Sequence, residues 1–244
     1  MSSPPPPPKR KVKTTLPTRP LRPSPTRPTI QTPRLLIRPF SPSDITGIHA
    51  LRQQPEVMRY ARTGRPDRDH ADTRAYMAAA LPPRDADTFN HVIALRATGE
   101  IIGTGGVIVH EGRGWPELGY LFRREAWGHG YATEFVRALL GAWWALPREG
   151  VEGVEVEVEG GAGEVVEEGR GPGEGEGEGG EVLEEVEERV YAMVEATNLG
   201  SCRVLEKVGF REFHRWVEID GREGRVGNVV PIVGFVLAEA DQKD

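Results

Sequence analysis

The chain has 244 residues, one cysteine and a formal net charge of −6, which allows one ordinary domain with extensions and excludes an intrachain disulfide. No apolar run approaches the ~20 residues of a membrane span, and the start of the chain lacks the apolar core of a secretory signal. We therefore expect a cytoplasmic protein of a reducing compartment that contacts no membrane.

Charge is distributed unevenly along the chain. Residues 1–34 carry eight Lys and Arg and no acidic residue, whereas residues 149–189 carry sixteen Glu and only two Arg. Because the total is −6, the remaining residues are neutral on balance. This pattern indicates a neutral folded body with a basic tail and an acidic insert.

The basic tail, residues 1–31, is rich in proline and poor in large apolar side chains. Such a segment buries too little surface to offset the entropy of ordering, so we expect it to be disordered. Within it, the run PKRKVK at residues 8–13 resembles a nuclear-localisation signal. A solvated basic tail is the favoured interpretation of this run, and a nuclear location is the alternative.

A folded domain is expected over residues 32–240, interrupted by the acidic insert. Its first half is predicted to contain, in order, a strand at 32–40, a helix capped by residues 41–44, a helix at 69–80 and a hairpin of strands at 89–96 and 100–110. The glycines of residues 103–106 precede more strand rather than a helix. We interpret them as a bulge or a close-packing feature and not as a dinucleotide site.

The stretch ELGYLFRREAWGHGYATEFVRALL at residues 117–140 is the strongest signal in the sequence. A predicted strand, Glu117–Phe122, leads into a glycine turn at residues 127–130, and helical spacing begins at Tyr131. The first N–H groups of a helix lack partners within it and carry partial positive charge, which favours a bound anion. Glycines at 128 and 130 would let a pyrophosphate approach the backbone.

Residues 149–181 consist almost entirely of Gly, Glu and Val, and we interpret them as a disordered loop inserted into the domain. Residues 154–159 alternate like a strand, but the flanking glycines and the like charges on one face argue against one. A short acidic helix is expected at 181–189. The domain is then predicted to resume with a strand at 190–194, a helix from Asn198 to Gly209 and strands at 213–219 and 229–237.

Two motifs, in this order, resemble those of the GNAT N-acetyltransferase family. Residues 127–134, WGHGYATE, resemble its acetyl-CoA pyrophosphate motif, in a form similar to the branch that contains ribosomal-protein N-terminal alanine acetyltransferases. Residues 198–210, NLGSCRVLEKVGF, resemble its later signature. The resemblance implies an α/β (α+β) GNAT acyl-CoA N-acyltransferase fold, with a mixed central sheet of about seven strands, about four flanking helices and a splay between the fourth and fifth strands.

The resemblance also implies acetyl-CoA as the co-substrate. Its pantetheine arm would bond to Leu121 and Phe122 on the unpaired strand edge. Asn198 would contact the cofactor or orient the acceptor, with helix capping as the alternative. The pyrophosphate would rest on the turn and the helix start, at Gly128, His129, Gly130, Tyr131, Ala132 and Thr133.

Some positions depart from the family pattern. Glu125 stands where the family often has Gln or Arg, so we expect it to point away from the phosphates. Arg123 and Arg124 either assist a phosphate or are solvated loop residues. Leu205 occupies the place of the family's frequent general-acid tyrosine, which leaves the leaving-group proton to water or to Ser201. Ser201 is equally interpretable as a cofactor contact or a structural cap.

The implied reaction is direct attack of a neutral primary amine on the thioester. An α-amine with a pKa near ~8 is appreciably neutral at pH 7, whereas a lysine near ~10.4 is not, so a protein N-terminus or a small amine is favoured over lysine. Glu117 is the candidate general base, with a solvated strand-end carboxylate as the alternative. Cys202 is interpreted as a core residue rather than an acyl carrier.

Other partners are given little support. No two histidines have metal-ligand spacing, so no metal is expected, and no specific nucleic-acid partner is predicted. The protein is expected to be a monomer or a homodimer. The alternative function is that of a catalytically weak GNAT-like binding module, which acts through its acidic insert and basic tail.

Overall fold

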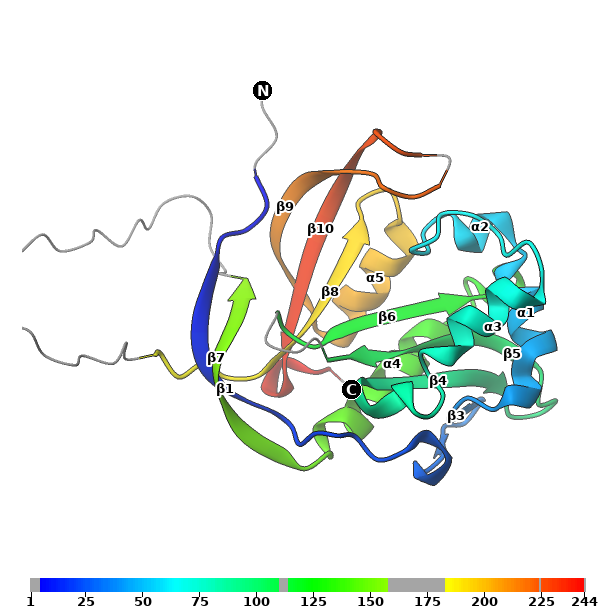
Figure 1. The fold of residues 1–244 in the computed structure, drawn as a ribbon, viewed down its shortest axis with the longest axis horizontal. Coiled ribbons are helices and arrows are strands. Elements are labelled where there is room, and N and C mark those ends of the chain that lie inside the picture. Colours follow the sequence, from blue (N-terminus) through cyan, green and yellow to red (C-terminus); the bar gives the residue numbers. More distant parts are fainter. Residues whose placement is uncertain (1–4, 110–113, 158–182, 224, 244) are drawn as a thin grey trace, which may run out of the picture.

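The computed structural model describes residues 5–109, 114–157, 183–223 and 225–243. These residues form one large mixed sheet with helices on both faces, and a two-stranded sheet lies beside it (Figure 1). The expected α/β architecture with a mixed central sheet is confirmed. None of the helices in these ranges is long and apolar enough to span a membrane.

The large sheet has eight described strands in the order β2-β3-β4-β5-β6-β8-β10-β9. Adjacent strands of this sheet are antiparallel, except that β6 and β8 are parallel. The strand beyond those expected is β2, a two-residue edge strand that pairs with β3. The strands are β2 (Ile30–Gln31), β3 (Leu35–Arg38), β4 (Thr88–Leu95), β5 (Ile101–Ile108), β6 (Glu117–Phe122), β8 (Arg189–Glu195), β9 (Arg211–Ile219) and β10 (Val229–Ala238).

The sheet splays open between β6 and β8, as the resemblance implied. The two strands are in register at a single described pair, Glu117 with Tyr191, and the Tyr191 N–H donates to the Pro116 carbonyl at 2.8 Å. Beyond this pair the strands leave their common start in different directions (Figure 1). The diverging part of β6 therefore has a backbone edge that β8 does not cover.

Helices cover both faces of the sheet. Thr104 and Gly105 are neighbours in β5 and so point to opposite faces. The Thr104 hydroxyl lies 2.9 Å from the Tyr76 hydroxyl of α3, whereas a Cβ on Gly105 would lie 2.8 Å from Phe135 of α4. The first face carries α1 (Ile45–Arg52), α2 (Pro55–Met58) and α3 (His70–Ala78), and the second carries α4 (Tyr131–Trp144) and α5 (Leu199–Val208). The four-residue α2 is the helix that was not expected.

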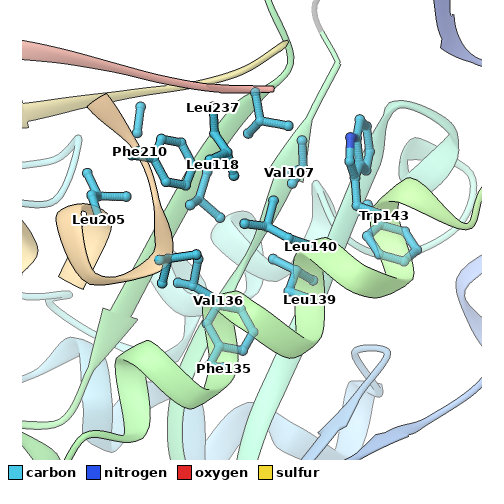
Figure 2. Close-up of a cluster of buried hydrophobic side chains, with 14 of the residues drawn as sticks. Val107, Leu118, Phe135, Val136, Leu139, Leu140, Trp143, Leu205, Phe210 and Leu237 are labelled. Atoms are coloured by element: carbon cyan, nitrogen blue, oxygen red, sulfur yellow. The ribbon is translucent and has the colours of Figure 1, made fainter. Parts of the chain in front are cut away.

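The main core lies between the sheet and α4. Apolar residues of α4 recur at helical spacing and are fully buried, which fixes the helix against β5, β6 and β10 (Figure 2). Burying one such side chain contributes roughly 1.5–3 kcal/mol. The buried residues of α4 are Phe135, Val136, Leu139, Leu140 and Trp143. This packing sets where the N-terminus of α4 lies relative to β6.

The glycines of β5 allow its two neighbours to approach closely. A Cβ on Gly103 would lie 2.6 Å from the Leu121 carbonyl oxygen, and one on Gly106 would lie 2.3 Å from the Phe89 carbonyl oxygen. Real side chains do not reach such distances, so the close-packing interpretation of residues 103–106 is confirmed. The bulge interpretation also holds at Gly103, because the register between β4 and β5 shifts there, with Ile93 opposite Gly103 and Ala94 opposite Ile101.

The prediction of disorder is wrong for part of the tail and part of the insert. Lys9–Pro17 form a strand, β1, and Arg148–Glu157 form another, β7, and the two pair antiparallel beside the main sheet (Figure 1). We call this pair the strap. The remainder of the expected insert, residues 158–181, lies outside the described residues, and so do residues 1–4.

The strap is stable because its two strands complement each other. The register places Lys9 opposite Glu157 and Lys13 opposite Glu152, so that like charges on each strand face opposite charges on the other. Val12 of β1 and Val154 of β7 are buried against Tyr191 and Trp216 of the main sheet. Each segment alone carries like charges that repel and few apolar residues. Pairing places opposite charges across from each other and lets the apolar residues of both strands be buried together.

Residues 183–188 also differ from the prediction, because they are extended rather than helical. They run beside β1, where the Lys13 N–H donates to the Glu184 carbonyl and the Val186 N–H donates to the Lys13 carbonyl, both at 2.8 Å. Glu188 is buried and pairs with Arg148 at 2.8 Å. Burial raises the pKa of Glu188 to about 7, against the opposing effect of the Arg148 charge.

Candidate functional site

The glycine turn after β6 is built as the sequence indicates. Gly128 and Gly130 have φ angles of 77° and 80°, a left-handed conformation that glycine adopts without steric cost. The turn is anchored by Trp127, whose indole N–H donates to the Phe122 carbonyl at 2.8 Å. A Cβ on Gly128 would meet no atom within 4 Å, so the backbone is bare on that side.

The N-terminus of α4 follows directly from this turn. Gly130 is its N-cap and provides no side-chain hydrogen bond to the helix. The N–H groups of Tyr131, Ala132 and Thr133 belong to the first turn, which has no earlier carbonyl to bond to. Together with the helix dipole, this arrangement suits an anion.

Arg34, which precedes β3 (Leu35–Arg38), contacts the turn through its guanidinium. Its guanidinium donates to the His129 carbonyl at 2.9 Å, lies 4.6 Å from the centre of the Tyr131 ring and pairs with Glu134 at 2.6 Å. The Thr32 hydroxyl also donates to Glu134 at 2.6 Å. Partial burial raises the pKa of Glu134, but these hydrogen bonds outweigh it and the net pKa is lowered. A guanidinium that is paired with Glu134 is therefore fixed beside the turn.

His129 is exposed within the turn. Its Nδ1 lies 2.8 Å from the Trp127 carbonyl, and its ring stacks on Tyr131 with centroids 5.8 Å apart and an interplanar angle of 19°. The imidazole therefore stabilises the turn by contacts with Trp127 and Tyr131. The backbone of His129 remains part of the expected anion site.

The charged residues just before the turn are held elsewhere. Glu125 accepts two hydrogen bonds from the Gln54 amide, at 2.9 and 3.1 Å, and these lower its pKa. Gln54 also accepts from the Arg124 N–H at 2.8 Å. The side chains of Arg123 and Arg124 pair with Glu100 and Glu56 at 2.7 and 2.9 Å. Their ion pairs favour a structural role over a phosphate contact.

The open edge of β6 presents the backbone of alternate residues. The Arg123 N–H bonds to Ile102 of β5, and the Leu121 carbonyl also faces β5, next to Gly103. By the same alternation, Tyr120 and Phe122 direct their backbone groups toward the splay. The expected backbone contact of Leu121 is therefore wrong, because its polar groups serve the β5 ladder. At Phe122 the N–H faces the splay, while the carbonyl accepts from Trp127.

At the closed end of the splay lies a pocket of about 150 Å³. Glu117 reaches it from β6 and Tyr191 from β8, and Glu157 enters it from the strap. Burial and then the charges of Glu157 and Glu117 raise the pKa of the Tyr191 hydroxyl well above its usual value. Tyr191 is therefore a neutral hydroxyl between carboxylates. The full lining is Lys9, Gly114, Trp115, Glu117, Glu157, Tyr191 and Met193.

The start of α5 lies across the splay from β6. The Asn198 side chain accepts from the Ser201 N–H at 3.2 Å, so the capping interpretation of Asn198 holds. Burial raises the pKa of Tyr120 to about 12, partly offset by the neighbouring Ser201 hydroxyl. Burial also raises the pKa of the Cys202 thiol, which opposes its use as a nucleophile. Leu205 is buried in the main core, so no hydroxyl is offered from that position.

Two parts of this site were not found from the sequence. Arg34 and Gln54 contact the turn region from positions far away in the chain, and neither carries a local motif. The contact between the glycine turn and Arg34, about a hundred residues earlier in the chain, is visible only once β3 lies beside α4. Within the described ranges, no group of three or more His, Cys, Asp or Glu residues is arranged to hold a metal ion.

Residues 34–211 match a family model described as the acetyltransferase (GNAT) domain. This match covers the glycine turn, the splayed strands and α5. Among curated protein sequences, no significant match was found.

Solved structures resemble the fold over most of its length. A GNAT-family acetyltransferase from Bacillus anthracis is 19% identical with a TM-score of 0.58, and the alignment covers 87% of this chain and 99% of that one. Spermidine N-acetyltransferase from Vibrio cholerae, in complex with CoA and spermine, is 15% identical with a TM-score of 0.57 and coverages of 86% and 98%. RimJ from Mycobacterium smegmatis, in complex with CoA-disulfide, is 16% identical with a TM-score of 0.57, and both coverages are 87%.

Proposed function

This chain belongs to the GNAT acetyltransferase family and is an acetyl-CoA-dependent N-acetyltransferase, and we propose that it acetylates a primary amine of a protein N-terminus or a small molecule by direct attack. The observation that carries the proposal is the line of three features along β6. An uncapped helix N-terminus lies at one end, an unpaired backbone edge follows, and a pocket with carboxylates lies at the other end.

The donor is proposed to lie along this line. The pyrophosphate binds the N–H groups from Gly128 to Thr133, beside the positive charge of Arg34. From Phe122 back to Glu117 the strand advances five residues, roughly 17 Å at ~3.3 Å per residue, over which an extended amide-rich arm bonds as a pseudo-strand. The open backbone groups of Tyr120 and Phe122 serve that arm. The thioester then lies near Glu117 and Tyr191.

The chemistry follows from the groups at that end. A neutral amine attacks the thioester carbonyl, its proton passes to Glu117, directly or through a water, and the C–S bond breaks. Coenzyme A has a thiol pKa of ~8.5 and leaves largely as thiolate, so a strong acid at the position of Leu205 is unnecessary. Ser201, beside Tyr120, is the available hydroxyl if a proton is donated. An α-amine or a small amine fits this site better than an unassisted lysine, because more of it is neutral at pH 7.

The strap bears on the binding-module alternative only in part. It pairs residues 9–17 of the basic tail with residues 148–157 at the start of the acidic insert, so these charges face each other rather than a partner. The rest of the insert, residues 158–181, lies outside the described residues.

A free-thiol assay tests the proposal. The full chain is incubated with acetyl-CoA and a panel of peptides with free N-termini, the same peptides with blocked N-termini and an internal lysine, and di- and polyamines. We expect thiol release with free N-termini or small amines and little with the blocked peptides. Release only with the blocked lysine peptides would contradict the acceptor class, and failure of acetyl-CoA to raise the melting temperature would contradict the proposed donor site.

A further inference from the structure

We propose that Lys9 is a self-acetylation site, because the strap places its ammonium group in the acceptor pocket. The inference rests on the proposed function, since it uses the same thioester and the same pocket. It concerns an acceptor that is part of the chain itself. The strap thereby takes part in the reaction as well as in the fold.

The pocket brings Lys9 beside the groups expected to act on an amine. Lys9 of β1 and Glu157 of β7 line it together with Glu117 and Tyr191, which mark the closed end of the splay. The Lys9 ammonium lies 3.7 Å from one Glu157 oxygen. The other Glu157 oxygen is buried and has no hydrogen-bond partner in the described part of the chain. The pocket therefore presents carboxylate oxygens to an ammonium group, and Lys9 is the lysine that lines it.

The position of Lys9 is fixed by the strand to which it belongs. Three residues further along β1, Val12 is completely buried against the sheet, and the register sets Lys9 directly opposite Glu157. The side chain itself is 45% exposed and its contact with Glu157 is long for an ion pair. Lys9 is thus anchored at its backbone and free at its tip, which lets the amine turn from Glu157 toward the thioester.

Tethering compensates for the high pKa of a lysine. With a pKa of ~10.4, less than about one lysine in a thousand is neutral at pH 7. An attached amine, however, is present at an effective concentration of the order of millimolar or more, and correct orientation adds further rate. The carboxylates of Glu117 and Glu157 beside it provide an acceptor for the proton.

The step balances with acetyl-CoA as the only co-reactant. A bond forms between Lys9 Nζ and the acetyl carbonyl carbon, and the C–S bond breaks. The ammonium loses one proton to Glu117 before attack and a second after it, and the departing thiolate takes up one of them. The products are acetyl-lysine, coenzyme A as thiol and one proton released to solvent. The charge of Lys9 is lost, and with it the ion pair to Glu157.

Two other lysines of the same strand are matched controls. Lys11 is exposed and does not line the pocket, and Lys13 pairs with Glu152 at 3.1 Å at the far side of a strand irregularity. Lys9 and Lys11 are both exposed, so chemical acetylation by the thioester in solution would modify both at similar rates. Acetylation in the pocket would favour Lys9.

The experiment follows acetylation of the purified full chain by peptide mass spectrometry after addition of acetyl-CoA alone. We expect acetyl-Lys9 to form at least tenfold faster than acetyl-Lys11 or acetyl-Lys13, at a rate constant independent of protein concentration. Glu117→Gln should slow it, and Lys9→Arg should abolish it without new modification at Lys11. Equal rates at Lys9 and Lys11, or a rate constant proportional to protein concentration, would overturn the inference.

A parallel thiol-release measurement with the amine panel separates the two proposals. Thiol release with external amines, but no acetyl-Lys9, would overturn the inference and leave the proposed function standing. Absence of both, together with no thermal stabilisation by acetyl-CoA, would remove the proposed function and the inference with it.

Discussion

Gly128→Ala is expected to weaken acetyl-CoA binding through backbone strain alone. A Cβ at this position meets no atom within 4 Å, so the methyl group clashes with nothing in the free protein. The φ angle of 77°, however, costs an alanine roughly 1–2 kcal/mol. If the free turn relaxes to avoid this cost and must return to bind the pyrophosphate, the KM for acetyl-CoA rises roughly 5- to 30-fold, since 1.4 kcal/mol is tenfold.

Gly99→Ala is the matched control for this strain. Gly99 has a φ angle of 73° and equally open space, but it lies in the turn between β4 and β5. Gly99→Ala should lower the melting temperature by a few degrees, at roughly 2–4 °C per kcal/mol for a domain of this size, and Gly128→Ala should lower it less, because its turn relaxes in the free protein. Only Gly128→Ala should raise the KM in the thiol-release assay. An equal change in KM for both variants would refute the assignment of the turn as the pyrophosphate site.

Three further predictions concern single side chains. Glu117→Gln should lower kcat by ~10²–10⁴-fold, the range attributed to general acid–base catalysis, and change the pH–rate profile; an unchanged rate and profile remove Glu117 from the mechanism. Arg34→Ala should raise the KM for acetyl-CoA by about fivefold or less, because a half-exposed ion pair is worth at most ~1 kcal/mol, and it should leave the KM for the amine unchanged in initial-rate kinetics. The pKa of Glu188 is about 7 in the folded state and 4.5 in the unfolded state. Between these two values the folded state binds more protons than the unfolded state, so the free energy of unfolding falls as the pH rises from 4.5 to 7. Glu188→Gln should therefore reduce the loss of unfolding free energy between pH 5 and pH 7.5 in urea titrations, and an undiminished loss would contradict the assignment.

The main elements around β6 and α4 were predictable because their signals are local. The glycine turn, the helix spacing from Tyr131 and the cap at Asn198 each need only a few neighbouring residues. The strap was missed because its stability lies in pairing between residues 9–17 and 148–157, more than a hundred positions apart. The composition of each segment, taken separately, predicted that the segment would be disordered. The complementary charges were visible, but nothing in either segment specified their register.

The site was predictable to the level of elements and less so to the level of atoms. The sequence places Leu121 and Phe122 on the right strand, but only the pairing of β5 with β6 decides which carbonyls face the splay. Arg34 was missed for a similar reason, since its contact with His129 and Glu134 joins residues about a hundred positions apart. Capping by Asn198 could be predicted because the hydrogen bond closes within three residues.

The strap also fixes the positions of the residues that flank residues 158–182. β1 pairs with β7, which ends at Glu157, and it bonds on its other side to residues 184–186, so one strand fixes both points between which the segment runs. The spacing of those points does not depend on the number of residues that join them. The place of β8 in the sheet is therefore independent of the length of the chain between Glu157 and Glu184.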